Sequence, residues 1–112
     1  MRWCSLSLLV LAGCAHAPAE LERIHQEVGE RITYVNYAKK DWRIIENGTT
    51  GTGNCAVFAI TYKWELLKIG YSPEVVLCEL ADGTGHAYTK VDGFVLDNRY
   101  NWVIPAEQQE CK

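Results

Sequence analysis

The stretch Cys55–Ile69 constrains the fold most, because it predicts a helix that is apolar on nearly every side. Its sequence is "CAVFAITYKWELLKI", in which apolar side chains are spread around the helix and leave no continuous polar face. A helix of this kind lies in the middle of a domain. Asn54 is a favourable N-cap, and Gly70 is a favourable stop signal. We therefore expect the chain to fold around this helix.

Elements of two kinds are predicted around the central helix. A first helix is expected over Pro18–Val35, with an outer polar face that includes His25 and an apolar stripe formed by Leu21, Ile24, Val28 and Ile32. After Pro73 the segments "EVVLCEL" and "HAYTKVDGFVLDN" are typical of strands. The order of these elements predicts an α+β domain in which a small antiparallel sheet packs on the buried helix.

The first residues are expected to be an export signal. The apolar run Leu6–Ala12 follows the positive charge of Arg2 and is too short to span a bilayer. It leads into Leu11-Ala12-Gly13-Cys14, which resembles the bacterial lipobox. The resemblance implies a signal peptide over 1–13, a lipid on Cys14, and hence membrane attachment of an exported protein.

With this signal set apart, the chain is expected to divide into the signal, a tether over 14–20 and one folded domain over 21–112. The residue after the lipidated cysteine is Ala15 and not Asp. In bacterial lipoproteins this favours delivery to the outer membrane, so the resemblance implies a periplasmic protein anchored there. The alternative is an ordinary signal peptide that is cut near Ala15 or Ala17.

Charge and ligand spacing exclude two classes of partner. The formal net charge is -3, and the sequence contains no run of Lys or Arg, so nucleic acid is not expected. Neither Cys-x-x-Cys nor His-x-x-x-His spacing occurs, so a zinc site is not expected. No cofactor is predicted.

Three cysteines remain once Cys4 and Cys14 are assigned to the signal and the lipid. They are Cys55, Cys78 and Cys111. An odd number leaves at least one thiol free or paired with another chain. The arrangement we expect is a bridge between Cys78 and Cys111 with Cys55 free, a pairing that the sequence alone leaves open.

Cys55 occupies a position that suits a reactive thiol. The Gly/Thr-rich loop "GTTGTG" precedes Asn54, which places the cysteine in the first turn of the helix. Unpaired N–H groups and the helix dipole favour the thiolate there. The alternative interpretation of Cys55 alone is a small, inert, buried residue.

The predicted hairpin brings a histidine and a carboxylate together. A two-residue turn at Asp92–Gly93 places Tyr88 opposite Asp97. His86 lies two residues before Tyr88 and points to the same face, which makes it a diagonal neighbour of Asp97. A histidine oriented by a carboxylate is the second half of a nucleophile–base–orienter triad.

Four segments together resemble the bacterial transglutaminase-like cysteine proteinases of the papain-like superfamily. They are "GNCAVFA", "KWELL", "GHAY" and "VLDN", at 53–59, 63–67, 85–88 and 95–98. The resemblance implies that Cys55 is the nucleophile, His86 the base and Asp97 the orienting group. It also implies that Asn98 supports the pair of His86 and Asp97. Asn54 supports the site as the N-cap of the helix.

The implied activity is a thiol hydrolase that cleaves an amide or acyl bond of an envelope protein or peptide. Transglutaminase-type acyl transfer, action on peptidoglycan peptides and a non-catalytic binding lipoprotein on the same fold are the alternatives. Some family members bind calcium through acidic residues beside the cysteine. Asn54, Ala56, Val57 and Phe58 stand at those positions, so no metal site is expected.

Overall fold

The computed structural model describes residues 16–112. Their elements are α1 (Ala19–Arg31), β1 (Ile32–Tyr34), β2 (Gly51–Gly53), α2 (Cys55–Lys68), β3 (Glu74–Glu79), β4 (Gly85–Val91), β5 (Phe94–Leu96), β6 (Ile104–Pro105) and the 3₁₀ turn η1 (Ala106–Gln108). The predicted signal peptide, the lipobox and Cys14 lie outside the described residues. The described part of the predicted tether runs directly into α1. No helix among residues 16–112 has the length and apolar character needed to cross a bilayer.

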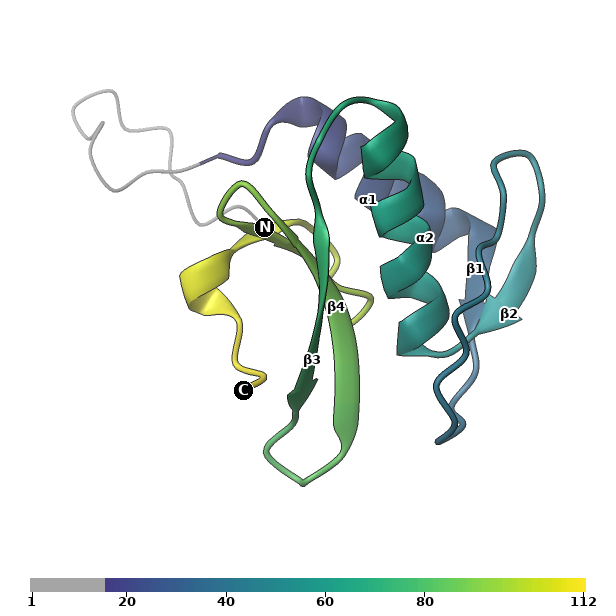
Figure 1. Ribbon diagram of the computed structural model, residues 1–112, viewed down its shortest axis with the longest axis vertical. Coiled ribbons are helices and arrows are strands. Elements are labelled where there is room, and N and C mark those ends of the chain that lie inside the picture. The colour runs from purple at the N-terminus through teal and green to yellow at the C-terminus, as the bar shows by residue number, and fades with distance from the viewer. Residues whose placement is uncertain (1–15) are drawn as a thin grey trace.

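Helix α2 occupies the centre of the fold, as its all-round apolar sequence predicts. Figure 1 shows it between the β3–β4 strands and the β1–β2 pair, with α1 crossing beside it. Ala56, Val57, Ala59 and Leu66 are completely buried. The helix ends at Lys68, one residue before the predicted end, and Gly70 follows with a φ of 93°. The predicted α+β architecture with a central cysteine-bearing helix is confirmed.

The main sheet is antiparallel, with the order β3-β4-β5-β6. The β4–β5 hairpin turns at Asp92 and Gly93, which have φ values of 51° and 81°. This pair of positive φ values is the geometry that a two-residue Asp-Gly turn favours. Val91 pairs with Phe94, so the predicted register is confirmed.

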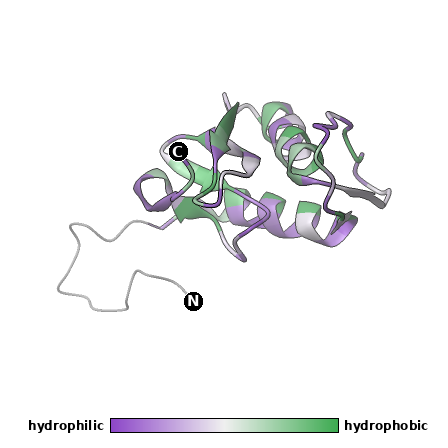
Figure 2. Cartoon of the chain, turned by 90° about the horizontal axis from the view of Figure 1, so that it is seen from below, coloured by the Kyte–Doolittle hydropathy of each residue, from purple (hydrophilic) through white to green (hydrophobic). Residues whose placement is uncertain are grey.

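Helix α1 is shorter than the sequence predicts, because its last predicted turn is a strand. The helix stops at Arg31, and Ile32–Tyr34 pair in parallel with Gly51–Gly53. All three residues of Ile32–Tyr34 are β-branched or aromatic, which favours the extended form once a partner strand is present. The predicted stripe of Leu21, Ile24, Val28 and Ile32 is buried. Figure 2 shows hydrophilic and hydrophobic segments alternating along this helix.

The C-terminal segment forms one edge of the sheet and then reaches the opposite edge, at β3. Strand β6 pairs with β5, and the backbones of Glu79 and Lys112 exchange hydrogen bonds of 2.7 and 3.2 Å. Cys78 and Cys111 form a disulfide, and Cys55 is a free, buried cysteine. This settles the pairing that the sequence left open.

Candidate functional site

Cys55 is the first residue of α2, and the two residues before it, Gly53 and Asn54, hold the start of the helix in place. A Cβ at Gly53 would meet the Val57 side chain at 2.4 Å, so only glycine fits there. The Asn54 side chain accepts a hydrogen bond from the Ala56 N–H at 3.1 Å, which is the predicted N-cap. The start of the helix is therefore held in one geometry.

The Asn54 side chain also shapes the wall of the site. Its amide nitrogen donates to the carbonyls of Tyr37 and Lys39, at 3.0 and 2.8 Å. One residue thus caps the helix and fastens the irregular segment that passes in front of Cys55. The sequence indicated the cap but not this second contact.

His86 and Asp97 meet as the hairpin register predicts. His86 lies near the start of β4, and Asp97 follows the last residue of β5. The ring nitrogen Nε2 of His86 lies 2.9 and 3.0 Å from the two carboxylate oxygens of Asp97. Both side chains are buried, with 3% and 1% of their surface exposed. A carboxylate in this position fixes the tautomer of the ring and stabilises its protonated form.

The Cys55 thiol completes a chain of three groups. It hydrogen-bonds the His86 ring and the backbone N–H of Ala87. Since Nε2 of His86 faces Asp97, Nδ1 is the nitrogen left for the thiol. The structure therefore brings Cys55, His86 and Asp97 together from a helix start, a strand start and a strand end.

The electrostatics of the three groups favour an ion pair. Burial opposes ionisation of Cys55, but its hydrogen bonds to His86 and Ala87 outweigh this and lower the pKa of the thiol. Burial also opposes protonation of His86, but Asp97 and Cys55 raise the pKa of the ring to about 9. Asp97 is desolvated as well, and its contact with His86 still leaves the pKa of this carboxyl below its usual value. These directions favour a thiolate beside an imidazolium.

Asp97 has two further partners that hold its carboxylate in place. The backbone N–H of Arg99 donates to Oδ1 and the Gln109 side chain donates to Oδ2, both at 2.9 Å. Gln109 belongs to the segment that the Cys78–Cys111 disulfide fastens to β3. No pattern in the sequence indicates this contact, because it depends on where the C-terminal segment folds back.

His25 is the other residue whose role the sequence did not indicate. It was expected on the solvent-exposed face of α1, which is wrong, because only 6% of its surface is exposed. Its Nε2 lies 3.0 Å from the Asp97 carbonyl, and its ring stacks on Tyr62 with centroids 5.5 Å apart. His25 is four residues after Leu21 and three before Val28, which is the helical spacing of the buried stripe. That spacing was the available signal.

A cleft of about 650 Å³ opens beside Cys55 and His86. Its walls come from the 34–40 segment, the start of α2, the β3–β4 turn and the loop after Asp97. Asn98 lines it, and the side-chain oxygen of Asn98 is buried without a hydrogen-bond partner. Within residues 16–112 the Asn98 side chain makes no hydrogen bond to His86 or Asp97, so any supporting role is exerted through the cleft wall.

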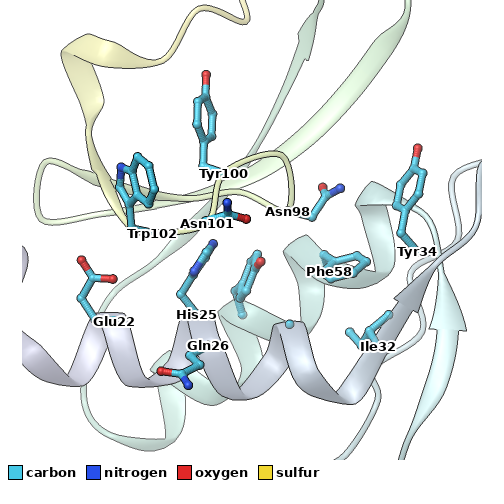
Figure 3. A pocket seen from close by; sticks show the side chains of 12 residues that line it. Glu22, His25, Gln26, Ile32, Tyr34, Phe58, Asn98, Tyr100, Asn101 and Trp102 are labelled. Atoms are coloured by element: carbon cyan, nitrogen blue, oxygen red, sulfur yellow. The ribbon is translucent and has the colours of Figure 1, made fainter. Parts of the chain in front are cut away.

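A second cavity, of about 620 Å³, lies on the other side of Tyr34 and Asn98, which line both spaces. Figure 3 shows His25 rising from α1 toward the loop that carries Asn98, Tyr100 and Trp102. The site is therefore part of a longer, partly aromatic depression.

A similarity to a solved structure agrees with this architecture. No family model and no curated protein matches the sequence. Among solved structures, the calcium-bound LapG of Legionella pneumophila is similar, with a TM-score of 0.65 and 16% identity. The similarity covers 83% of this chain and 60% of the LapG chain, so the chain spans less than two thirds of that structure. The likeness shows a papain/transglutaminase-type α+β fold.

Proposed function

We propose that this chain is a thiol hydrolase of the peptidase type, with Cys55 as nucleophile, His86 as acid and base, and Asp97 as the group that orients His86. The observation that carries the proposal is the buried, hydrogen-bonded chain from Cys55 through His86 to Asp97. The fold shared with LapG, a bacterial transglutaminase-like cysteine protease, supports a cysteine-protease type of function.

The proposed reaction has two halves. The Cys55 thiolate attacks the acyl carbon, and the C–N bond breaks as the departing amine takes the proton of the His86 imidazolium. Water then attacks the thioester while the neutral His86 ring accepts its proton. The C–S bond breaks, the acid is released, and the thiolate–imidazolium pair is restored.

The start of α2 also offers a donor for the oxyanion. The Asn54 side chain occupies the Ala56 N–H, and the Asn54 carbonyl accepts from Val57 and Phe58. Within the described residues the Cys55 N–H donates to no partner, so it is available to the oxygen of the tetrahedral intermediate.

The substrate class and the location are part of the proposal. We infer an envelope protein or peptide as substrate and a lipid anchor on Cys14, which the lipobox-like sequence supports. The Cys78–Cys111 disulfide supports an oxidising, exported environment. Transfer of the acyl group to an amine shares the first half-reaction. Measuring free acid against amide product distinguishes transfer from hydrolysis.

Calcium does not fit the residues near the cysteine. The LapG structure is of a calcium-bound protein, whereas the residues after Cys55 are the apolar Ala56, Val57 and Phe58. No group of three or more His, Cys, Asp or Glu side chains within residues 16–112 is placed to hold a metal ion. Calcium binding needs several oxygen ligands, so the mechanism uses none.

The pH dependence of two model reactions tests the proposal. A peptide p-nitroanilide needs a proton for its leaving amine, so its hydrolysis is expected to fall as the pH rises through about 9 and His86 loses its proton. A p-nitrophenyl ester needs no such proton, so its rate of Cys55 acylation is expected not to fall there. Mass spectrometry locates the acyl group, and Cys55→Ser is the control. A protein that forms no acyl group on Cys55 with either reagent would contradict the proposal.

A further inference from the structure

The cleft beside Cys55 carries positive charge without a carboxylate on its walls. The two ionised side chains that line it, apart from the site itself, are Lys40 and Arg99, and no Asp or Glu is among the lining residues of the described chain. Within the site, the thiolate, the imidazolium and the buried Asp97 carboxylate sum to one negative charge, which the two positive charges of Lys40 and Arg99 exceed. The open part of the cleft is therefore electropositive.

Lys40 lies close to the reacting group. Its Nζ would be 3.6 Å from a Cβ at Gly85, the residue directly before His86. No carboxylate within residues 16–112 forms an ion pair with Lys40. The adjacent Asp41 is already engaged by the Tyr37 hydroxyl and the Arg43 guanidinium, each at 2.8 Å. The Lys40 charge is thus left for a ligand.

Arg99 contributes a weaker positive charge at the other wall. It is exposed, and its guanidinium lies over the Tyr100 ring, 5.5 Å from the ring centroid. Its charge also acts on Asp82 in the β3–β4 turn. Lys40 is therefore the main unbalanced charge.

We propose that this cleft selects acyl substrates that carry a carboxylate close to the bond being cleaved, with Lys40 as the main specificity-determining residue and Arg99 as the second. The inference rests on the proposed function, because it takes the Cys55 thiolate as the reacting atom. It names acidic peptides as the substrate class. Neutral or basic peptides gain no electrostatic attraction from Lys40 and Arg99.

The first test compares iodoacetate with iodoacetamide on Cys55. The two reagents share a leaving group and differ in one negative charge, and each forms a C–S bond with the thiolate and releases iodide. Their rate ratio is independent of the thiolate fraction, because both react with the same thiolate. Dividing the rate ratio for Cys55 by the same ratio for glutathione removes the intrinsic difference in reactivity between the two reagents.

The expected result is a normalised ratio above one that falls by up to about fivefold in Lys40→Gln, the scale of a partly exposed charge pair. Lys40→Arg should keep the ratio, and added salt should lower it in the wild type. Lys39→Gln is the matched control, because Lys39 is exposed and its side chain does not line the cleft. This control should leave the ratio unchanged.

A ratio equal to that of glutathione, or one that Lys39→Gln lowers as much as Lys40→Gln, would overturn the inference. The absolute iodoacetamide rate reports separately on the proposed function. A fast rate with an unchanged ratio rejects only the anion preference. A slow rate with a Lys40-dependent ratio rejects the activated nucleophile and keeps the anion-selective cleft.

Matched peptides then separate two sources of the carboxylate. Alanine-rich hexapeptides with Glu or Gln at one position are compared, each with a free or an amidated C-terminus, and cleavage is followed by mass spectrometry. We expect the Glu peptides to be cleaved faster whichever C-terminus they carry, and Lys40→Gln to remove this preference. A preference for the free C-terminus alone assigns the carboxylate to the chain end. Equal cleavage of all four peptides by the wild type would overturn the inference.

Discussion

Replacing His86 with alanine is expected to lower the rate of amide hydrolysis by about 10²- to 10⁴-fold, the usual contribution of a positioned acid–base group. His86 hydrogen-bonds both Cys55 and Asp97. Its loss removes the proton donor for the leaving amine and raises the pKa of the Cys55 thiol toward its ordinary value. The measurement is steady-state hydrolysis of a peptide p-nitroanilide at neutral pH.

Two control variants show whether the loss of rate in His86→Ala comes from the missing imidazole. His86→Gln is closer in size and checks that the loss is chemical, with circular dichroism confirming the fold of each variant. His16→Ala removes an exposed histidine outside the cleft and is expected to leave the rate unchanged. A rate in His86→Gln within about twofold of the wild type would contradict the assigned role, because a general acid contributes far more.

Removing the Cys78–Cys111 disulfide is expected to have the largest effect on stability. The bridge spans a sequence separation of 33, and a closed loop of that length corresponds to about 3–4 kcal/mol of the free energy of unfolding in the chain-entropy account. The measurement is urea denaturation of a Cys78→Ser, Cys111→Ser double variant. A midpoint equal to that of the wild type would contradict the prediction.

The same double variant is expected to weaken the site, because the bridged segment carries Gln109 to Asp97. Gln109→Ala is the matched control: it keeps the disulfide and removes only this contact. We expect it to lower the hydrolysis rate with a much smaller loss of stability than the double variant. Equal losses of stability in the two variants would show that the contact, and not the bridge, holds the segment.

The parts of this fold that the sequence predicts are those set by local rules. The all-round apolar pattern of 55–69 predicts the central helix, and a two-residue turn at Asp92–Gly93 fixes the hairpin register. That register alone is sufficient to bring His86 to Asp97. Each of these inferences depends on neighbours within a few residues along the chain or across one turn.

The parts that could not be predicted depend on contacts between distant segments. Ile32–Tyr34 become a strand only because Gly51–Gly53 pair with them in parallel, and a glycine-rich segment gives little sign of being a strand. Gln109 reaches Asp97 because the C-terminal segment folds back along β3. Lys40 belongs to an irregular segment whose path is set by the Asn54 side chain. Local periodicity contains no information on these three arrangements.

The pH dependence of Cys55 alkylation by iodoacetamide tests the central claim most directly. The reaction is followed at the Cys55 peptide by mass spectrometry, so that other thiols do not interfere, in the wild type and in Asp97→Asn. The site lowers the pKa of Cys55, so alkylation should reach half its maximal rate below the free-thiol value of about 8.5. In Asp97→Asn the imidazolium is less stable, and the midpoint should shift upward. A midpoint near that of a free thiol, identical in both proteins, would contradict an activated Cys55.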